Sequence, residues 1–251
     1  MLAELPRRAD REPVVGAGMG GDETTAIDAA VERAVIARFD AAASGQFTLV
    51  SEELGRRGSS DGVWIVLDPI DGSINAKRGL PFFSLSVAIA VGGTMDDVVF
   101  GFVHDFGTGE EWTAERGGGA RLNGAPLDGD RPKGEIEILA LEATRTDLVA
   151  IHTPPLVGLV HRLRIFGSLA ISLCHLADGR VDGVCSLKAA RSVDIAAAQL
   201  LVRERGLAID LFEARAPRRF GEAPLDLEGR SRVVAAGTGD LCAQIAAALS
   251  A

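Results

Sequence analysis

The chain has 251 residues, 47% of them apolar, which is enough for a sizeable core in one large domain or two closely packed ones. Its formal net charge of -9, with no block of consecutive Lys or Arg, argues against nucleic acid or a membrane surface as a partner. The three cysteines are widely spaced and lie in apolar stretches, which predicts reduced core thiols. The N-terminus has no apolar leader and the chain has no apolar run long enough to span a bilayer, so we expect a cytoplasmic protein.

Two predicted strands in the first part of the chain end in acidic residues. Apolar residues at helical spacing predict a helix over Thr24 to Phe39, and a strand over Phe47 to Val50 follows and leads to Glu52. The unbroken apolar stretch Val63 to Leu67 is typical of a buried strand, and Asp68-Pro69-Ile70-Asp71-Gly72-Ser73 comes directly after it. Acids at two strand ends are candidates for one shared site.

The remainder of the first half predicts an antiparallel sheet. Strands are expected over Phe83 to Val91, Val98 to His104 and Glu110 to Ala114, and Asn123-Gly124 is a strong tight-turn signal. We therefore expect antiparallel sheet with helices on one face.

The pattern changes after Pro132. Strands are predicted over Ile136 to Glu142 and Val181 to Leu187, and helices over Leu169 to Ala177 and Ile195 to Arg205. This alternation is typical of an α/β layer. We divide the chain into an N-terminal α+β layer, residues 1–132, and a C-terminal α/β layer, residues 133–251, that completes the site.

The pair Asp68 and Asp71 is the strongest chemical signal. Pro69 stiffens the turn between them, and two carboxylates this close repel each other unless a proton or a metal ion intervenes. Mg²⁺ prefers oxygen ligands and shares substrate phosphate oxygens, so this pair with Glu52 would form a suitable half-cage. The alternative is a Pro-containing turn with solvated acids.

Asp194 directly precedes a predicted helix, which leaves its role open. Its side chain is a candidate N-cap that accepts a backbone N–H of the first turn. Because a helix start also favours a phosphate, the same carboxylate is a candidate metal ligand at a phosphate site.

Four segments together resemble the ordered motifs of the inositol monophosphatase superfamily. They are Ser51-Glu52-Glu53-Leu54-Gly55, Trp64 to Asn75 with its Asp68-Pro69-Ile70-Asp71-Gly72-Ser73 core, Gly167-Ser168-Leu169-Ala170, and Val193-Asp194-Ile195-Ala196-Ala197. The pattern is most similar to the archaeal-type branch, whose members act on inositol phosphates and fructose 1,6-bisphosphate. The resemblance implies an α/β fold, specifically an αβαβα sandwich, and a homodimeric Mg²⁺-dependent phosphatase of a small phosphorylated metabolite with two or three Mg²⁺ ions per site.

The resemblance also implies roles for individual residues. Metal ligands would be Glu52, Asp68, Asp71, Asp194 and the main-chain carbonyl of Ile70. Ser73, paired with Asp28, would orient and deprotonate the attacking water together with Glu52.

Other residues are candidates for binding the substrate. Backbone N–H groups of Gly72 and Ser73 are suited to a phosphate. Gly167 and Ser168 belong to a family motif near the substrate. Arg164 and Arg191 are each candidates for a guanidinium fork on a second anionic group, or are merely solvated.

The chain departs from the family at its start. A short segment with Pro6 and Pro13 stands where the family has a long helix, and Asp22 to Thr25 replace a Gly-Thr-Pro-Thr stretch. Ser73 replaces a Thr and so lacks the methyl that restricts the hydroxyl rotamer. These differences leave the level of activity and the oligomeric state open. The sequence also does not separate inositol phosphate, fructose bisphosphate and nucleotide bisphosphate as substrates, and it does not determine lithium sensitivity.

Two other functions remain as alternatives. Gly16, Gly18 and Gly21 satisfy a dinucleotide-binding fingerprint, which would suggest an oxidoreductase, although this reading leaves the Asp68 to Ser73 segment unexplained. A catalytically weak relative acting as a metal- or metabolite-binding regulatory protein is the second alternative.

Overall fold

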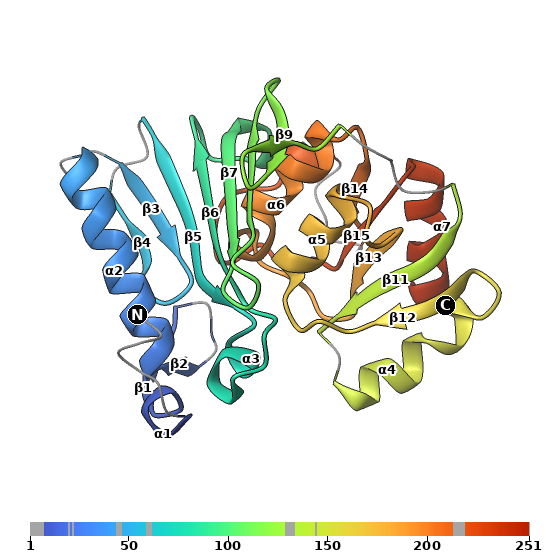
Figure 1. The fold of residues 1–251 in the computed structure, drawn as a ribbon, viewed down its shortest axis with the longest axis horizontal. Coiled ribbons are helices and arrows are strands. Elements are labelled where there is room, and N and C mark those ends of the chain that lie inside the picture. The colour runs from blue at the N-terminus through green and yellow to red at the C-terminus, as the bar shows by residue number, and fades with distance from the viewer. Residues whose placement is uncertain are drawn as a thin grey trace.

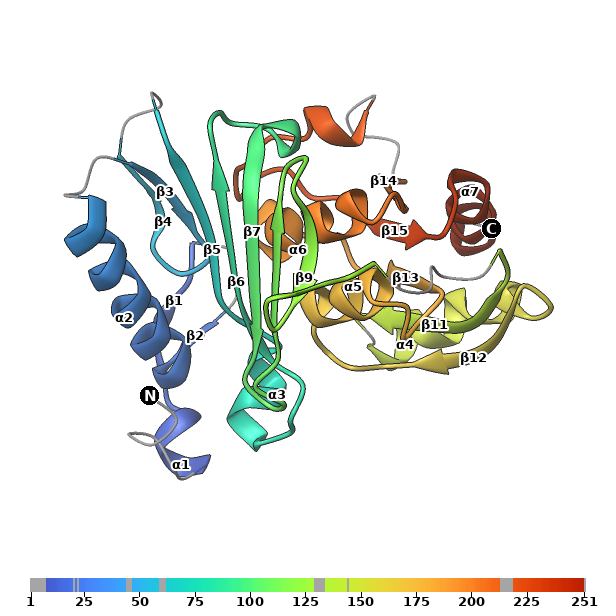
Figure 2. The same cartoon turned by 45° about the horizontal axis from the view of Figure 1, so that its top comes forward.

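The fold is an αβαβα sandwich, seen edge-on in Figures 1 and 2, and it confirms the predicted fold class. The computed structural model describes residues 8–19, 21, 23–43, 47–58, 62–128, 134–143, 145–212 and 219–250. From one side to the other lie α2, an eight-stranded sheet, the pair α5 and α6, a five-stranded sheet, and α7 with α4. The helices are α1 (Arg8–Arg11), α2 (Ala26–Ala43), α3 (Ser73–Arg78), α4 (Thr146–His152), α5 (Leu169–Ala177), α6 (Ser192–Glu204) and α7 (Gly239–Ser250). Short 3-10 helices span Met95–Asp97, Pro154–Leu156 and Phe220–Glu222.

The eight-stranded sheet has the order β10-β9-β8-β7-β6-β5-β3-β4 and is antiparallel except for the pair β3 and β5. Its strands are β3 (Thr48–Ser51), β4 (Gly55–Arg57), β5 (Trp64–Asp71), β6 (Ser84–Ala90), β7 (Val98–Asp105), β8 (Glu111–Glu115), β9 (Gly119–Leu122) and β10 (Ala125–Pro126). Asn123 and Gly124 both have positive φ between β9 and β10, as a tight hairpin turn requires, so the predicted turn is confirmed.

The five-stranded sheet has the order β12-β11-β13-β15-β14, with parallel pairs at β12-β11-β13 and antiparallel pairs beyond. Its strands are β11 (Ile136–Glu142), β12 (Val160–Arg164), β13 (Gly183–Ser186), β14 (Ala208–Leu211) and β15 (Val233–Ala236). The predicted bounds of β11 and α5 agree with the structure.

We expected helices on one face of the first sheet, and both of its faces carry a helix, as the predicted αβαβα sandwich requires. The helix α2 packs on one face, with a core around Ile27, Leu49 and Leu67, and α6 packs on the other. All nine residues of α5 are buried, because α5 and α6 lie between the two sheets and contribute to one large core that reaches both. A helix that is apolar all round needs such a central layer.

The glycine-rich segment near the start does not form a dinucleotide site. Its strand β1 (Val14–Ala17) is exposed throughout and pairs antiparallel with the short β2 (Glu23–Thr25). A dinucleotide fold needs a buried strand in a parallel sheet before the glycines. Gly20 and Asp22 lie outside the described residues, and the oxidoreductase reading loses its structural support.

Three further features concern the whole chain. The predicted division at residue 132 falls within 129–133, outside the described residues, and stays a prediction. The three cysteines are buried and form no disulfide, as predicted. Among the helices that the structure describes, none combines the length and the apolar character needed to span a bilayer.

Candidate active site

The register of two parallel strands places the first two acids side by side. In the pair β3 and β5, Ser51 lies opposite Leu67, so Glu52 and Asp68 follow at neighbouring strand ends. The backbone N–H of Glu52 donates to the carbonyl of Leu67 over 3.3 Å, which continues the pairing. Both acids are buried, with 8% and 1% of Glu52 and Asp68 exposed. The expected meeting of acids at strand ends is therefore present.

The segment after Asp68 is an irregularity in the sheet. Asp68 pairs with Ser86 and Asp71 with Ser84, so β5 carries an extra residue in a bulge that includes Pro69. The carboxylate of Asp68 accepts the backbone N–H of Ile70 over 3.0 Å, which closes the turn. The carbonyl of Ile70, a predicted metal ligand, accepts the hydroxyl of Ser73 over 3.0 Å.

Asp194 reaches the cluster from a helix start, but it is not the N-cap. The helix α6 begins at Ser192, earlier than the predicted Ile195, and Arg191 is its N-cap residue. The carboxylate of Asp194 reaches back and accepts the backbone N–H of Arg191 over 2.8 Å. The side chain of Asp194 therefore both accepts a backbone N–H at the helix start and lies close to the other acids.

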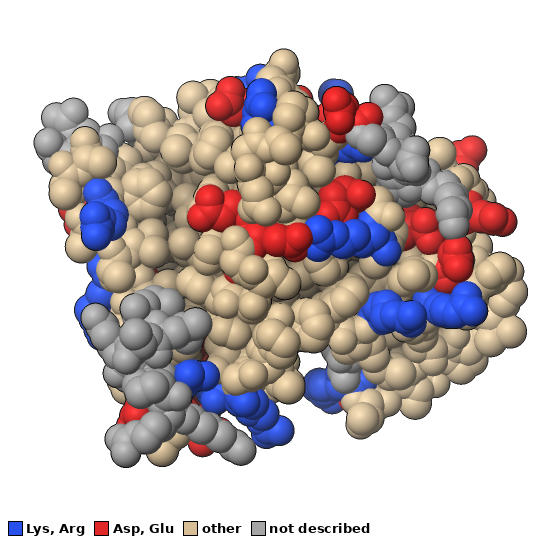
Figure 3. Space-filling view, viewed as in Figure 1, with Lys and Arg blue, Asp and Glu red and all other residues tan. Residues whose placement is uncertain are grey.

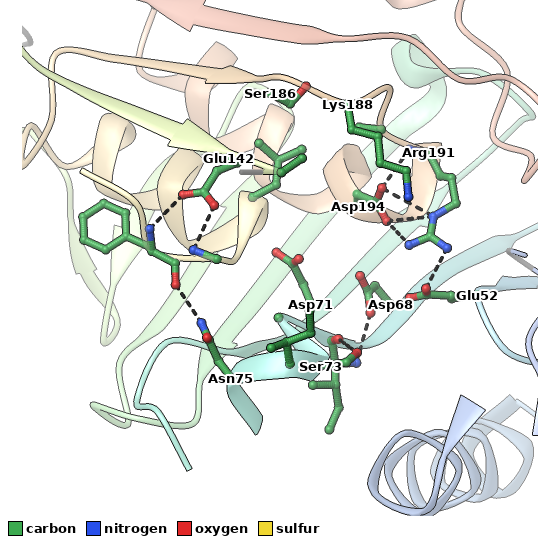
Figure 4. Close-up of a pocket in the computed structure, with 18 of the residues that line it drawn as sticks. Glu52, Asp68, Asp71, Ser73, Asn75, Glu142, Ser186, Lys188, Arg191 and Asp194 are labelled. Atoms are coloured by element: carbon green, nitrogen blue, oxygen red, sulfur yellow. Dashed lines mark hydrogen bonds and ion pairs between the residues drawn. The ribbon is translucent and has the colours of Figure 1, made fainter. Parts of the chain in front are cut away.

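Glu52, Asp68 and Asp194 form a cluster in which one carboxylate oxygen from each lies within 4.8 Å of the others. Figure 4 shows these three side chains and Asp71 pointing into the same cavity. Asp71 also reaches the start of α5, where it accepts the hydroxyl of Ser168 over 2.7 Å and the N–H of Ala170 over 2.6 Å.

Arg191 is a positive partner of this cluster, and Lys188 lines the same cavity. The guanidinium of Arg191 contacts Glu52 over 2.6 Å and Asp194 over 3.0 Å. Burial acts to lower its pKa, but Asp194, Glu52 and Asp68 outweigh burial and raise it, so the guanidinium is always charged. One guanidinium cannot neutralise four neighbouring carboxylates.

Burial and the neighbouring carboxylates raise the pKa values of the acids in the cluster. Burial, opposed by Arg191 and assisted by Asp194, raises the pKa of Glu52 to about 8. Burial together with Glu52 and Asp71 raises the pKa of Asp68 well above its usual range. Burial raises the pKa of Asp71 to about 7 despite the hydrogen bond from Ser168. Buried acids with this repulsion hold protons or a cation.

The donor set fits a hard cation such as Mg²⁺. It consists of carboxylate oxygens and one main-chain carbonyl, and within it the described side chains offer neither a histidine nor a cysteine. Zinc and the softer metals favour nitrogen and sulfur, whereas magnesium binds oxygen ligands.

The acids line one side of a cavity of about 950 Å³ between the two halves of the molecule. Gly72 and Gly167 lie where two segments of its wall meet, both with positive φ. A Cβ on Gly72 would lie 2.8 Å from the carbonyl oxygen of Phe82, and one on Gly167 would lie 2.7 Å from the side chain of Asn75. Close backbone approach and a positive φ therefore require glycine at Gly72, whereas at Gly167 the positive φ favours glycine and the close contact is with a side chain.

The structure separates some of the predicted site residues. Arg164 lies on the edge strand β12, is exposed and donates to the carbonyl of Leu163, outside the residues that line the cavity. Ser168 is the N-cap of α5, accepts the N–H of Ile171 and donates to Asp71. Its contacts are therefore to the protein rather than to the cavity.

Asp28 and Ser73 are not joined by a hydrogen bond in the described part of the chain. Asp28 is buried, and one of its oxygens accepts the N–H and the hydroxyl of Thr25 over 3.0 Å and 2.5 Å. Its other oxygen is buried without a hydrogen-bond partner. Ser73 lines the cavity and donates to Ile70.

Sequence reasoning missed Glu142 at the end of β11. Glu142 lines the cavity, is 2% exposed, and accepts the N–H groups of Phe166 and Gly167 and the hydroxyl of Ser172. Burial raises its pKa to about 7 despite these hydrogen bonds. The only signal was an acid at the end of a predicted strand, which is the signal used for Glu52.

Asn75 ends the motif segment Trp64 to Asn75, and its position in that motif does not indicate its structural role. Its amide donates to the carbonyls of Phe82 and Phe166 over 2.7 Å each. It therefore joins α3 to two segments of the cavity wall, one from each half of the chain.

The five layers and the acid cluster between them define a sandwich of the inositol monophosphatase and fructose-1,6-bisphosphatase type. The chain belongs to the inositol monophosphatase family, whose family model matches residues 5–251. The predicted family and its archaeal-type resemblance are thereby confirmed.

Individual proteins of this family are similar to the chain in sequence and in structure. A fructose-1,6-bisphosphatase/inositol-1-monophosphatase of Archaeoglobus fulgidus is 32% identical over 238 residues, which cover 94% of this chain and 87% of that protein. The Nus factor SuhB of Escherichia coli is 34% identical over 193 residues, which cover 74% of this chain and 70% of that protein. A solved inositol monophosphatase-fructose 1,6 bisphosphatase superposes with a TM-score of 0.83 at 28% identity, covering 96% of this chain and 91% of the other.

Proposed function

We propose that the protein is a Mg²⁺-dependent phosphomonoesterase of a small phosphorylated metabolite, either an inositol monophosphate or fructose 1,6-bisphosphate. The observation that carries the proposal is the cluster of buried Glu52 and Asp68 with half-buried Asp194, at a cavity large enough for a sugar phosphate. The names of the archaeal relatives support the same substrates.

The residues that would hold the metal are Glu52, Asp68, Asp71, Asp194 and the carbonyl of Ile70. When bound, Mg²⁺ would supply positive charge to the phosphate and lower the pKa of a water molecule. Their burial favours this role, since a charged cluster in a low-dielectric site gains the most from a cation.

The chain's own groups would bind and orient the reactants. Gly72 and Ser73 line the cavity directly after Asp71, and their backbone N–H groups would serve as donors to a phosphate. Asp28 keeps its proposed part in accepting a proton because one buried oxygen has no hydrogen-bond partner among the described residues. Ser73 would orient the water, and Glu142 and Asn75 hold the wall around it.

The cavity entrance suits an anionic ligand. Figure 3 shows basic side chains on both sides of a notch at the lower edge of the molecule, between α3 and α4. Lys77 of α3 and Arg145 just before α4 are among the residues that line the cavity, and Arg145 also pairs with Asp147 over 2.5 Å. These charges raise the local concentration of phosphorylated ligands even though the whole protein is acidic.

The test is phosphate release from inositol 1-phosphate and from fructose 1,6-bisphosphate, with Mg²⁺ and with EDTA. We expect release from at least one of them with Mg²⁺ only, and loss of release in Asp68→Asn. Release that persists in EDTA would contradict the metal dependence, and equal release by Asp68→Asn would contradict the site. Sedimentation of the same sample tests the homodimer that we also propose.

A regulatory role is the second candidate, and the similarity to proteins named Nus factor SuhB favours it. In that case turnover by the wild type would be no greater than that of Glu52→Gln on every phosphoester tested. The acid cluster itself argues against this role, since an inactive protein has little need for buried acids that repel one another.

A further inference from the structure

Arg191 occupies the acid cluster in a way that ordinary surface pairing does not explain. Its side chain is 12% exposed and its Nη1 lies 2.6 Å from Oε1 of Glu52. Its Nη2 and Nε lie 3.0 Å and 3.2 Å from Oδ1 of Asp194. The guanidinium therefore uses oxygens of two of the three carboxylates that form the candidate cation site.

The backbone fixes Arg191 in this place. It is the N-cap residue of α6, and its own N–H is held by Asp194. From the helix start its side chain spans to Glu52 at the end of β3, as Figure 4 shows. The ion pair therefore connects the helix layer to the first sheet across the cavity.

A divalent cation at the cluster and the guanidinium would use the same two carboxylates, those of Glu52 and Asp194. A Mg²⁺ ion at the cluster would be held by the carboxylates of Glu52 and Asp194. The positive charge of Mg²⁺ would then repel the guanidinium, and the carboxylates of Glu52 and Asp194 would become weaker hydrogen-bond acceptors for it. Two cations that use the same carboxylates must lower each other's affinity, whichever binds first.

We propose that Arg191 is a built-in counter-ion that stabilises the metal-free cluster and competes with Mg²⁺ for Glu52 and Asp194. Binding of the metal releases the guanidinium from Glu52 into the cavity that it already lines. This inference rests on the proposed function, because it takes the cluster to be a cation site. Arg191 thereby sets the metal concentration at which the site fills.

The experiment measures Mg²⁺ binding by titration calorimetry on protein freed of metal with EDTA, without any substrate. Arg191→Gln removes the competing charge, and we expect its Kd for Mg²⁺ to fall by about fivefold or more. The same variant should lose thermal stability in EDTA and regain it with Mg²⁺. The matched control is Arg203→Gln, which breaks the ion pair to Asp96 at the far end of the same helix and should leave Kd unchanged.

A second variant keeps the test decisive if Arg191→Gln does not fold. Arg191→Lys keeps the charge but cannot contact both carboxylates with a fork, so its Kd for Mg²⁺ should lie below that of the wild type and above that of Arg191→Gln. A wild-type or weaker Kd in the folded Arg191 variants would overturn the counter-ion role. Absence of Mg²⁺ binding in the wild type would instead overturn the proposed function.

Discussion

The carboxylate of Asp68 is the most buried member of the cluster, so its charge has the largest effect on the site. Asp68→Asn keeps the shape and removes that charge. We expect phosphate release to fall at least about 100-fold, which corresponds to about 2.7 kcal/mol of transition-state stabilisation. In EDTA the variant should unfold at a higher temperature than the wild type, because a source of repulsion is gone.

Two measurements on one preparation check the Asp68 prediction. Initial rates with Mg²⁺ give the loss of activity, and thermal unfolding in EDTA gives the stability. A variant that is inactive and also less stable than the wild type would indicate a structural role for Asp68 and would count against the cation site.

Glu142 has a different role, because three donors converge on its carboxylate. In Glu142→Gln one carboxylate oxygen becomes an NH₂ group. This NH₂ would point at the N–H of Phe166 or of Gly167, so that buried donor would lose its acceptor. We expect a loss of about 1–3 kcal/mol in the free energy of unfolding. Hydrogen exchange should become faster at the amides of Phe166 and Gly167, while equal protection in both proteins would refute the role.

At the scale of elements, the turn from β5 into α3 is held by contacts that only glycine permits. Gly72→Ala places a Cβ 2.8 Å from the carbonyl of Phe82 at a φ of +97°. Gly109→Ala is a matched control, since its φ is +77° and its Cβ would meet nothing within 4 Å. We expect about 1 kcal/mol of destabilisation for the control and clearly more for Gly72→Ala.

Urea unfolding measures the loss in the free energy of unfolding for Gly72→Ala and for Gly109→Ala under the same conditions. Because Gly72 also lies at the cavity, the rate of phosphate release should fall in Gly72→Ala and stay near wild type in Gly109→Ala. Equal destabilisation of the two variants would show that the close approach at Gly72 has no energetic weight.

The elements that carry the metal site were predictable because their signals are local. The apolar run before Asp68 and the strand before Glu52 are visible in sequence, and the parallel register of β3 and β5 brings their ends together. The start of α6 was missed by three residues, since Ser192 and Val193 are poor indicators of a helix and their burial decides the outcome.

The remainder of the site depends on tertiary contacts that no local pattern contains. Glu142 joins it because β11 lies beside β13 and because the start of α5 folds over its carboxylate. Arg191 could be given no more than an anion-binding role from sequence, since its contact with Glu52 links residues far apart in the chain. The exposed position of Arg164 follows from β12 being an edge strand, which sequence spacing alone does not determine.

At the scale of the whole molecule, the site lies where the layers meet. Glu52, Asp68 and Asp71 come from the first sheet, Asp194 from the central helices and Glu142 from the second sheet. Repulsion within the site therefore acts directly between layers, and its neutralisation stabilises their packing. The stability of the fold and the state of the site are for this reason coupled.

This coupling predicts how the metal-free protein responds to pH. Glu52, Asp71 and Glu142 have pKa values raised to about 8, 7 and 7, chiefly by burial, so the folded state holds protons that the unfolded state has released. Stability from these groups is fully present below their ordinary pKa values near 4 and is lost as the pH rises through 7 and 8. His175, whose pKa burial lowers to about 4, acts in the opposite direction but only below its ordinary pKa of 6.5.

The free energy of unfolding in EDTA should therefore fall between pH 6.5 and pH 8, a window that contains the raised pKa values of Glu52, Asp71 and Glu142 and lies above the ordinary pKa of His175. Saturating Mg²⁺ should remove most of this fall, because the metal binds the deprotonated carboxylates and releases their protons. Urea unfolding at several pH values with EDTA and with Mg²⁺ measures both effects. A fall that Mg²⁺ does not change would place the titrating groups away from the metal site, whereas a flat curve in EDTA would show that the acid cluster does not strain the fold.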